Sequence, residues 1–300
     1  MKITGGSGDD KVYGGYSTDG KSYLYGNSGK DIIRSDWFRS KDGDATNDGE
    51  DEYLFGDFKY GTDALDKDLW GDADIIYGGY GDDDADSYIY GGDGDDQIHP
   101  GDYWDDSYVY GGNGADTIYV PELTGGDLII RGGDGDDVWV VDSYGETSSS
   151  NQNTDNYFFG GAGNDVIRGS HFLESDEFLY GGAGEDKIYG GDAGELGHLL
   201  VGGSGDDWIE AGSNMTTGGA STTFYVYGDG FDYDNGRGVS KQGYNDNEAT
   251  YGNADDWRTD NGDDVIYGGS NNMGSHYFVG GYGNDKIITG SNNEGSGASI

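Results

Sequence analysis

Aspartates recur at one fixed position of a glycine-rich, nine-residue frame. The frame reads G-G-x-G-x-D-x-U-x, where U is aliphatic or tryptophan. It occurs at 5–13, 91–99, 111–119, 132–140, 160–168, 181–189, 202–210 and 280–288, and 26–34 departs from it only at the second position. Glycine tolerates the positive φ angles of sharp turns, so the frame can aim several carbonyl oxygens at one point. Carboxylate and carbonyl oxygens together are the ligands that calcium takes.

Two further frames are interrupted by insertions. One opens at 56–57 and resumes at 71–76, and the other opens at 228–229 and resumes at 262–266. With them the chain has about eleven frames, most of them starting 20 or 21 residues apart. Each frame has an aspartate at its sixth position: Asp10, Asp31, Asp74, Asp96, Asp116, Asp137, Asp165, Asp186, Asp207, Asp264 and Asp285.

The frames resemble the nonapeptide repeats of the RTX (repeats-in-toxin, hemolysin-type calcium-binding) family, and the resemblance covers nearly all 300 residues. It implies a parallel β-roll with calcium ions between successive turns. The eleven aspartates would then supply side-chain oxygens. Frame glycines would supply carbonyl oxygens: Gly6, Gly8, Gly92, Gly94, Gly112, Gly114, Gly133, Gly135, Gly161, Gly163, Gly182, Gly184, Gly203, Gly205, Gly281 and Gly283. About ten ions would add about +20 to the formal charge of −43.

The pattern departs from that family in one respect. Typical RTX turns use two nonapeptides, whereas here one good nonapeptide alternates with a looser half-turn. We therefore expect one all-β domain over 1–300, a parallel β-roll or β-helix solenoid of about eleven turns with calcium concentrated on one edge. The acidic residues Asp82, Asp83, Asp84 and Asp192 leave open whether the other edge also binds calcium. Loop insertions are expected near 36–51, 57–70, 142–156 and 229–261.

Two columns of apolar residues are expected to form a thin core that grows only by stacking. One column is the eighth frame position: Val12, Ile33, Ile76, Ile98, Ile118, Trp139, Ile167, Ile188, Ile209, Ile266 and Ile287. The other lies two residues before each frame: Ile3, Leu24, Leu54, Ile89, Val109, Ile130, Phe158, Leu179, Leu200, Val226 and Phe278.

The neighbours of the second column point outward, because strand residues alternate faces. Most of them are aromatic: Tyr23, Tyr25, Tyr53, Phe55, Tyr88, Tyr90, Tyr108, Tyr110, Tyr157, Phe159, Phe178, Tyr180, Tyr225 and Tyr227. Stacked turns would align them into two ladders about 50 Å long. An apolar face of that extent is typical of an interface, but stacking that stiffens the sheet, loops that cover it, or a polysaccharide platform are alternatives.

Composition excludes several function classes. Only 16 basic residues oppose 59 acidic ones, which argues against nucleic acid and against an anionic membrane surface. No apolar run has the length of a membrane helix, and Met1 leads into Lys2-Ile3-Thr4 without an apolar signal region. The chain has no cysteine, no H-E-x-x-H and no G-x-S-x-G. The four histidines, 99, 171, 198 and 276, show no ligand spacing and are expected at the surface, so we expect no enzyme.

These observations favour an extracellular or cell-surface structural protein. The chain starts almost inside a repeat and ends soon after one, which predicts head-to-tail pairing with further copies of itself into a filament, sheath or surface layer, with lateral pairing through the aromatic face. A calcium-stabilised polysaccharide-binding module is the alternative, and an export or folding module of a larger secreted protein is a third hypothesis.

Overall fold

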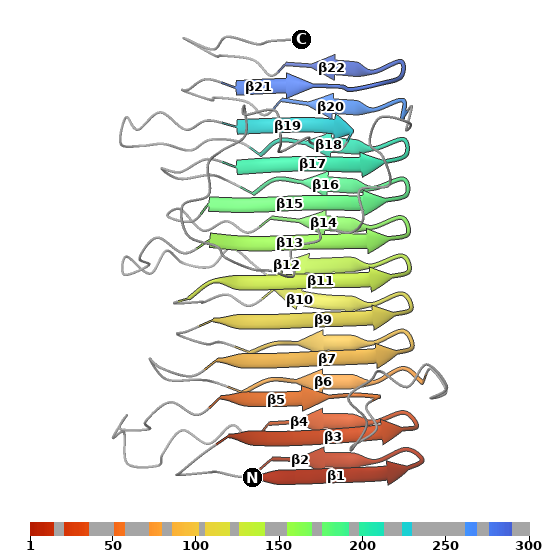
Figure 1. The fold of residues 1–300 in the computed structure, drawn as a ribbon, viewed down its shortest axis with the longest axis vertical. Coiled ribbons are helices and arrows are strands. Elements are labelled where there is room, and N and C mark those ends of the chain that lie inside the picture. The colour runs from red at the N-terminus through yellow and green to blue at the C-terminus, as the bar shows by residue number, and fades with distance from the viewer. Residues whose placement is uncertain are drawn as a thin grey trace.

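The computed structural model is a solenoid of two parallel sheets that face each other across a thin core (Figure 1). Every element of the described residues is a β-strand, and each sheet has 11 strands, one from each turn. The predicted parallel β-roll solenoid of about eleven turns is therefore confirmed. The structure describes residues 1–14, 21–35, 51–57, 72–79, 86–101, 106–120, 126–141, 155–169, 176–191, 198–212, 224–229, 262–268 and 276–289.

The odd-numbered strands form one sheet and the even-numbered strands the other. The odd strands are β1 (Lys2–Ser7), β3 (Ser22–Ser28), β5 (Glu52–Phe55), β7 (Ser87–Asp93), β9 (Ser107–Asn113), β11 (Leu128–Asp134), β13 (Asp155–Ala162), β15 (Asp176–Ala183), β17 (His198–Ser204), β19 (Phe224–Asp229) and β21 (His276–Val279). The even strands are β2 (Lys11–Tyr13), β4 (Ile32–Arg34), β6 (Ile75–Tyr77), β8 (Gln97–His99), β10 (Thr117–Val120), β12 (Val138–Val141), β14 (Val166–Arg168), β16 (Lys187–Tyr189), β18 (Trp208–Glu210), β20 (Val265–Tyr267) and β22 (Lys286–Ile288).

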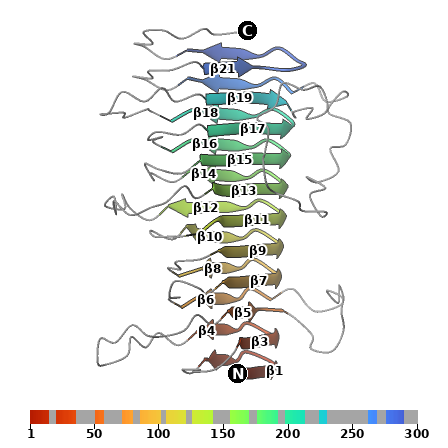
Figure 2. The same cartoon turned by 60° about the vertical axis from the view of Figure 1, so that its left-hand side comes forward.

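The nonapeptide frame is where the chain crosses from one sheet to the other. In a typical turn, β7 ends in the first three residues of the frame 91–99, and β8 contains its last three. We call the edge made by these crossings the first edge, and the opposite edge, where odd strands begin, the second edge. The first edge lies on the right of Figure 1, and Figure 2 shows both sheets running along the whole stack.

Neighbouring strands pair so that equal frame positions face each other, whatever the length of the segment inserted between them. Ile188 pairs with Ile209, which pairs with Ile266, although the second step spans 57 residues and the first only 21. Equal frame positions therefore stack at every turn, because a one-residue slip would move the apolar side chains out of the core.

Both predicted apolar columns lie in the core. Their members are almost fully buried, except for Ile3 and Ile287 in the two terminal turns, which are partly buried. A third inward-facing column was not predicted. It lies two residues before the second column, near the second edge, and its buried members are mostly polar: Glu52, Ser87, Ser107, Leu128, Asn156, Glu177 and His198.

One glycine position shows why the frame tolerates a single departure. Seven second-position glycines have φ between +112° and +130°, and Asn27 at the same position has φ +78°. Asparagine is among the few residues with a side chain that visit this region readily. The frame 26–34 therefore forms the same turn as its neighbours.

Two predicted insertion boundaries are wrong. Asp155 and Asn156, placed in an insertion, belong to β13 and pair with Asp176 and Glu177. Asp229 is likewise the last residue of β19. These strands extend beyond their apolar residues because the backbone ladder, and not hydrophobicity, sets their length. The remainder of the four predicted insertions, and Asp82, Asp83, Asp84 and Asp192, lie outside the described residues, apart from Asp51 and Asp57. In the described part of the chain, no helix is long and apolar enough to cross a membrane.

Candidate metal site along the first edge

The eleven sixth-position aspartates form one column along the first edge. In ten successive pairs, the backbone N–H of one aspartate donates to Oδ1 of the aspartate in the next turn, at 2.7–3.1 Å. The bonds all run in the same direction, from Asp10 at one end to Asp285 at the other. We call this column the first aspartate ladder.

The second carboxylate oxygen of the ladder has no protein partner. In the nine aspartates between the two end members, Oδ2 is buried and accepts no hydrogen bond, and the residues are at most 2% exposed. In most turns this oxygen lies against the first glycine of its own frame, so that a Cβ on Gly91 would collide with Oδ2 of Asp96. A buried carboxylate oxygen without a partner is costly, so the ladder needs either a cation or a proton.

Burial raises the pKa of these carboxyl groups. Loss of hydration is the largest cause throughout, the backbone N–H bond opposes it, and neighbouring carboxylates add to it. The pKa reaches about 6 at Asp31, about 7 at Asp116, about 8 at Asp137 and about 9 at Asp96 and Asp207. Without a cation, much of the ladder would therefore be protonated near neutral pH.

Backbone carbonyl oxygens supply the other potential ligands. The carbonyl of the fourth-position glycine points along the stack toward the same glycine of the next turn, so that a Cβ on Gly114 would collide with the carbonyl oxygen of Gly94. No backbone donor of the described residues hydrogen-bonds these fourth-position carbonyls. Carbonyl and carboxylate oxygens together are the donor set that calcium accepts. Among the described residues, no group of three or more His, Cys, Asp or Glu side chains that could hold a metal is found.

The structure brings the predicted ligand residues together on this edge. All eleven aspartates lie in one column, and the predicted glycines lie in the two columns of second and fourth positions. Two further carboxylates were missed. Asp57 and Asp229 occupy the second position of the interrupted frames and are 6% and 5% exposed. The signal was their place directly after Gly56 and Gly228, which the interruption concealed.

A different aspartate ladder runs along the second edge, five residues before some of the frames. Its members with described side chains are Asp51, Asp86, Asp106, Asp127 and Asp155. Here Oδ1 accepts the backbone N–H of the following turn, from Asp127 to Asp106 and from Asp155 to Asp127, each at 2.9 Å. From the sequence, calcium binding at this edge stayed an open question, and this ladder was not predicted.

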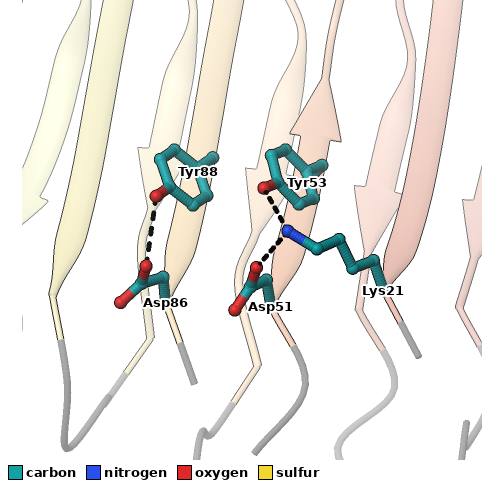
Figure 3. A network of polar contacts seen from close by, with 5 residues as sticks. All are labelled: Lys21, Asp51, Tyr53, Asp86 and Tyr88. Carbon is teal, nitrogen blue, oxygen red and sulfur yellow. Dashed lines mark hydrogen bonds and ion pairs between the residues drawn. The ribbon is translucent and has the colours of Figure 1, made fainter. Parts of the chain in front are cut away.

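Tyrosine hydroxyls and one lysine contact four of the five carboxylates of the second aspartate ladder. Tyr88 donates to Asp86 at 3.1 Å, and Tyr108 and Tyr157 donate to Asp106 and Asp155 at 3.3 and 3.0 Å. At the N-terminal end, Lys21 lies 2.6 Å from Asp51 and 3.1 Å from the Tyr53 hydroxyl (Figure 3). These contacts raise the pKa of the exposed Lys21, chiefly through Asp51.

The expectation that all four histidines lie at the surface is wrong for His198. It is 2% exposed in the third inward column, with Nδ1 3.2 Å from Oε2 of Glu177 one turn earlier. His99 stacks between Tyr77 and Tyr119, with ring centroids 4.6 and 3.9 Å away. His171 and the side chain of His276 lie outside the described residues.

The outward aromatic residues stack face to face instead of presenting their faces to solvent. Tyr23, Tyr53, Tyr88 and Tyr108 form one run with centroid separations of 4.7–4.9 Å and interplanar angles of 4–13°. We call this face, with its companion column of Tyr25, Phe55, Tyr90 and Tyr110, the aromatic ladder.

The aromatic ladder is interrupted in the middle of the chain. In β11 the outward residues are Ile129 and Arg131, which separate Tyr108 and Tyr110 from the aromatic residues of β13. The Arg131 guanidinium lies 4.7 Å from the Phe159 ring centroid and so partly bridges the gap. Leu199 and Val201 of β17 interrupt the columns again, between the aromatic residues of β15 and β19. The two ladders predicted from the sequence are thus each divided into three aromatic runs.

A comparison with protein families assigns the repeats. The RTX calcium-binding nonapeptide repeat matches residues 2–16, 16–39, 105–120, 152–171, 174–193 and 199–214. A search of curated proteins found no significant match.

Proposed function

We propose that this chain, which carries RTX calcium-binding nonapeptide repeats, is a non-catalytic structural protein that calcium holds folded and that assembles head to tail outside the cell. RTX repeats are calcium-binding modules, generally without catalysis, and they occur in secreted proteins. The assembly that we propose is a filament, a sheath or a surface layer.

Calcium binding rests on the first aspartate ladder. Its buried Oδ2 atoms have no hydrogen-bond partner, and the fourth-position carbonyls of the same edge point along the stack and accept no backbone hydrogen bond from the described residues. Bound calcium would supply positive charge there, and the chain's own residues would supply the oxygens. About ten ions would lower the magnitude of the net charge of −43 by about 20.

Head-to-tail assembly rests on the polarity of the same ladder. At one end, the backbone N–H of Asp10 donates to Asp31, but the Asp10 carboxylate accepts no N–H from a preceding described turn. At the other end, the Asp285 carboxylate accepts the N–H of Asp264, but no following aspartate in the described residues accepts the N–H of Asp285. A second copy placed end to end would join Asp285 to Asp10 with the geometry repeated at every internal turn. Such a heterologous contact produces an open filament.

The strands at both ends support this pairing. Among the described strands, β1 and β2 pair on one side only, as do β21 and β22. Exposed large apolar residues concentrate in the same two turns: Met1, Tyr13, Tyr277, Val279, Tyr282 and Ile288. Unpaired strand edges with apolar residues favour addition of another strand.

Ring stacking disfavours the polysaccharide alternative. Sugars pack against the open face of an aromatic ring, and in the aromatic ladder most such faces are covered by the ring of the next turn. We assign the ladder to stiffening of the sheet and to lateral pairing of filaments. Replacing Tyr88, Tyr90, Tyr108 and Tyr110 with serine should abolish lateral association and leave calcium-dependent folding intact.

The experiment is polymerisation of the 300-residue chain, followed by sedimentation and electron microscopy in millimolar calcium and in chelator. We expect filaments in calcium alone. A bulky folded domain fused to Met1 through a protease site should block growth, and its removal by the protease should restore it. Calcium-loaded chain that sediments as a monomer at high concentration would overturn the proposal.

A further inference from the structure

The two interrupted turns differ from the nine intact ones at the second frame position. Intact frames have glycine there, or Asn27 in one case, whereas the interrupted frames have Asp57 and Asp229. Both aspartates keep the backbone bond of their column, since each donates its N–H to the first-glycine carbonyl of the next turn, Gly91 or Gly280, at 3.0 and 3.1 Å. The acidic side chain is therefore added to an otherwise ordinary position of the first edge.

The backbone at these two positions differs from that of most intact turns, eight of which have a positive φ at this position. Asn27 is the one non-glycine residue with positive φ in the described part of the chain, so Asp57 and Asp229 lack the left-handed conformation. In intact frames the second-glycine carbonyl points at the next turn, so that a Cβ on Gly112 would collide with the oxygen of Gly92. A Cβ on Gly281 would instead collide with the carboxylate of Asp229, and one on Gly92 would approach Cβ of Asp57 to 2.8 Å.

Both carboxylates are placed like ligands and not like surface charges. Asp57 is 6% exposed, its Oδ1 is buried without a hydrogen bond, and its Oδ2 accepts only a long bond of 3.4 Å from the Asp72 N–H. Asp229 is 5% exposed, and its Oδ2 accepts the N–H of Tyr282 in the next turn. A carboxylate that replaces a carbonyl in the same column keeps an oxygen there and adds negative charge.

Each added carboxylate lies among members of the first aspartate ladder. The charges of Asp31 and Asp72 act on Asp57, and the charge of Asp57 acts in turn on Asp74 and Asp96. Asp229 acts in the same way on Asp207 and Asp264. Buried carboxylates that repel one another in this way require a counter-ion or a proton.

We infer that Asp57 and Asp229 are additional calcium ligands, so that the two interrupted turns hold calcium more tightly than the intact turns. This inference rests on the calcium binding proposed above. Affinity in oxygen-ligand sites rises with the number of charged ligands. Each added carboxylate therefore compensates for any ligand geometry lost where the inserted segment splits the frame after its second residue. The ions at these two turns should bind first as the calcium concentration rises.

The test is a calcium titration of the whole chain against a chromophoric chelator. Wild type should show two ions bound more tightly than the rest. In the double variant Asp57→Asn, Asp229→Asn, which keeps side-chain shape, the tight pair should weaken by roughly tenfold or more. Circular dichroism in millimolar calcium should match wild type, which separates lost affinity from a failure to fold.

Two control variants sharpen the result. Asp95→Asn removes one charge from an exposed residue of the same edge, and Asn27→Gly changes a second position without changing charge. Both should keep the tight pair. Identical titrations of wild type and double variant would overturn the inference and leave calcium binding standing, as would an equal loss in Asp95→Asn. Absence of calcium binding in wild type would overturn the proposed function itself.

Discussion

Each edge of the solenoid carries its own column of aspartates linked by backbone hydrogen bonds, and the two columns differ in whether the second carboxylate oxygen has a partner. On both edges an aspartate Oδ1 accepts a backbone N–H from an adjacent turn, at 2.7–3.1 Å on the first edge and 2.9 Å on the second. On the first edge the other oxygen is buried without a hydrogen-bond partner in the nine internal aspartates, whereas on the second edge it meets a tyrosine hydroxyl or Lys21 at Asp51, Asp86, Asp106 and Asp155. Burial and partner, not residue type, therefore decide which edge depends on a cation.

Removal of calcium should break the first edge and with it the fold. Nine buried Oδ2 atoms would lose their counter-ions together, and the thin core cannot compensate for that loss. We expect a largely unfolded chain in chelator and a β-rich circular dichroism spectrum in millimolar calcium. A spectrum that does not change across the titration would contradict the dependence of the first edge on a cation.

A matched pair of substitutions compares the edges within the same pair of strands. Asp116→Ala removes a buried member of the first ladder and should cost about 2–4 kcal/mol in calcium. Asp106→Ala, ten residues earlier on the second edge, removes bonds to Tyr108 and to the Asp127 N–H and should cost about 1 kcal/mol. Chemical denaturation in calcium measures both.

Hydrogen exchange adds a spatial test to the same pair. Protection should fall around 91–140 in Asp116→Ala and change little beyond 181, because each turn contacts only its neighbours. Equal costs for Asp106→Ala and Asp116→Ala would show that the edges do not differ in the way described.

The pH dependence of stability should reverse with calcium. In chelator the raised pKa values, about 7 at Asp116 and about 9 at Asp96, mean that the folded state binds more protons than the unfolded one. Residual structure should therefore be greatest at about pH 4 or below and decrease as pH rises from there through 7 to 9. In calcium, protons compete with the ion and stability should instead fall as pH drops. Circular dichroism at several pH values checks both directions, and parallel profiles would be inconsistent with a shared proton and cation site.

The smallest expected effect belongs to the second edge. Tyr88→Phe removes the hydroxyl that donates to Asp86 but keeps the ring stack with Tyr53 and Tyr108. We expect a loss of about 0.5–1 kcal/mol in thermal or chemical denaturation. Tyr110→Phe, at a residue that is 40% exposed and tilted out of the stack, is the control and should be near neutral.

Features at fixed positions of the repeated frame could be predicted from the sequence, whereas features outside the frames were missed. The first ladder and both apolar columns follow from fixed frame positions, so their alignment could be read without coordinates. The second ladder lies five residues before only some of the frames, in segments of irregular length, and before the frame 26–34 that position is Lys21. His198 contacts Glu177 of the preceding turn, and both residues are polar, so no apolar pattern in the sequence marked them as inward-facing. Asp57 was assigned to an insertion because its frame is split by 14 residues before Asp72.

The hydrogen bonds between turns have a mechanical consequence. Hydrogen bonds between turns run along the solenoid axis, so a force that pulls the two ends apart loads them in tension, one turn after another. Each released turn lengthens the chain by its own residue count at up to roughly 3.5 Å per residue. Steps between aspartates 20 or 21 residues apart would release about 70 Å, whereas the step of 43 residues from Asp31 to Asp74 would release about 150 Å and the step of 57 residues from Asp207 to Asp264 about 200 Å. Under load the chain would therefore extend as a series of small yields with two long ones, because the two inserted segments add chain length that the intact turns do not have.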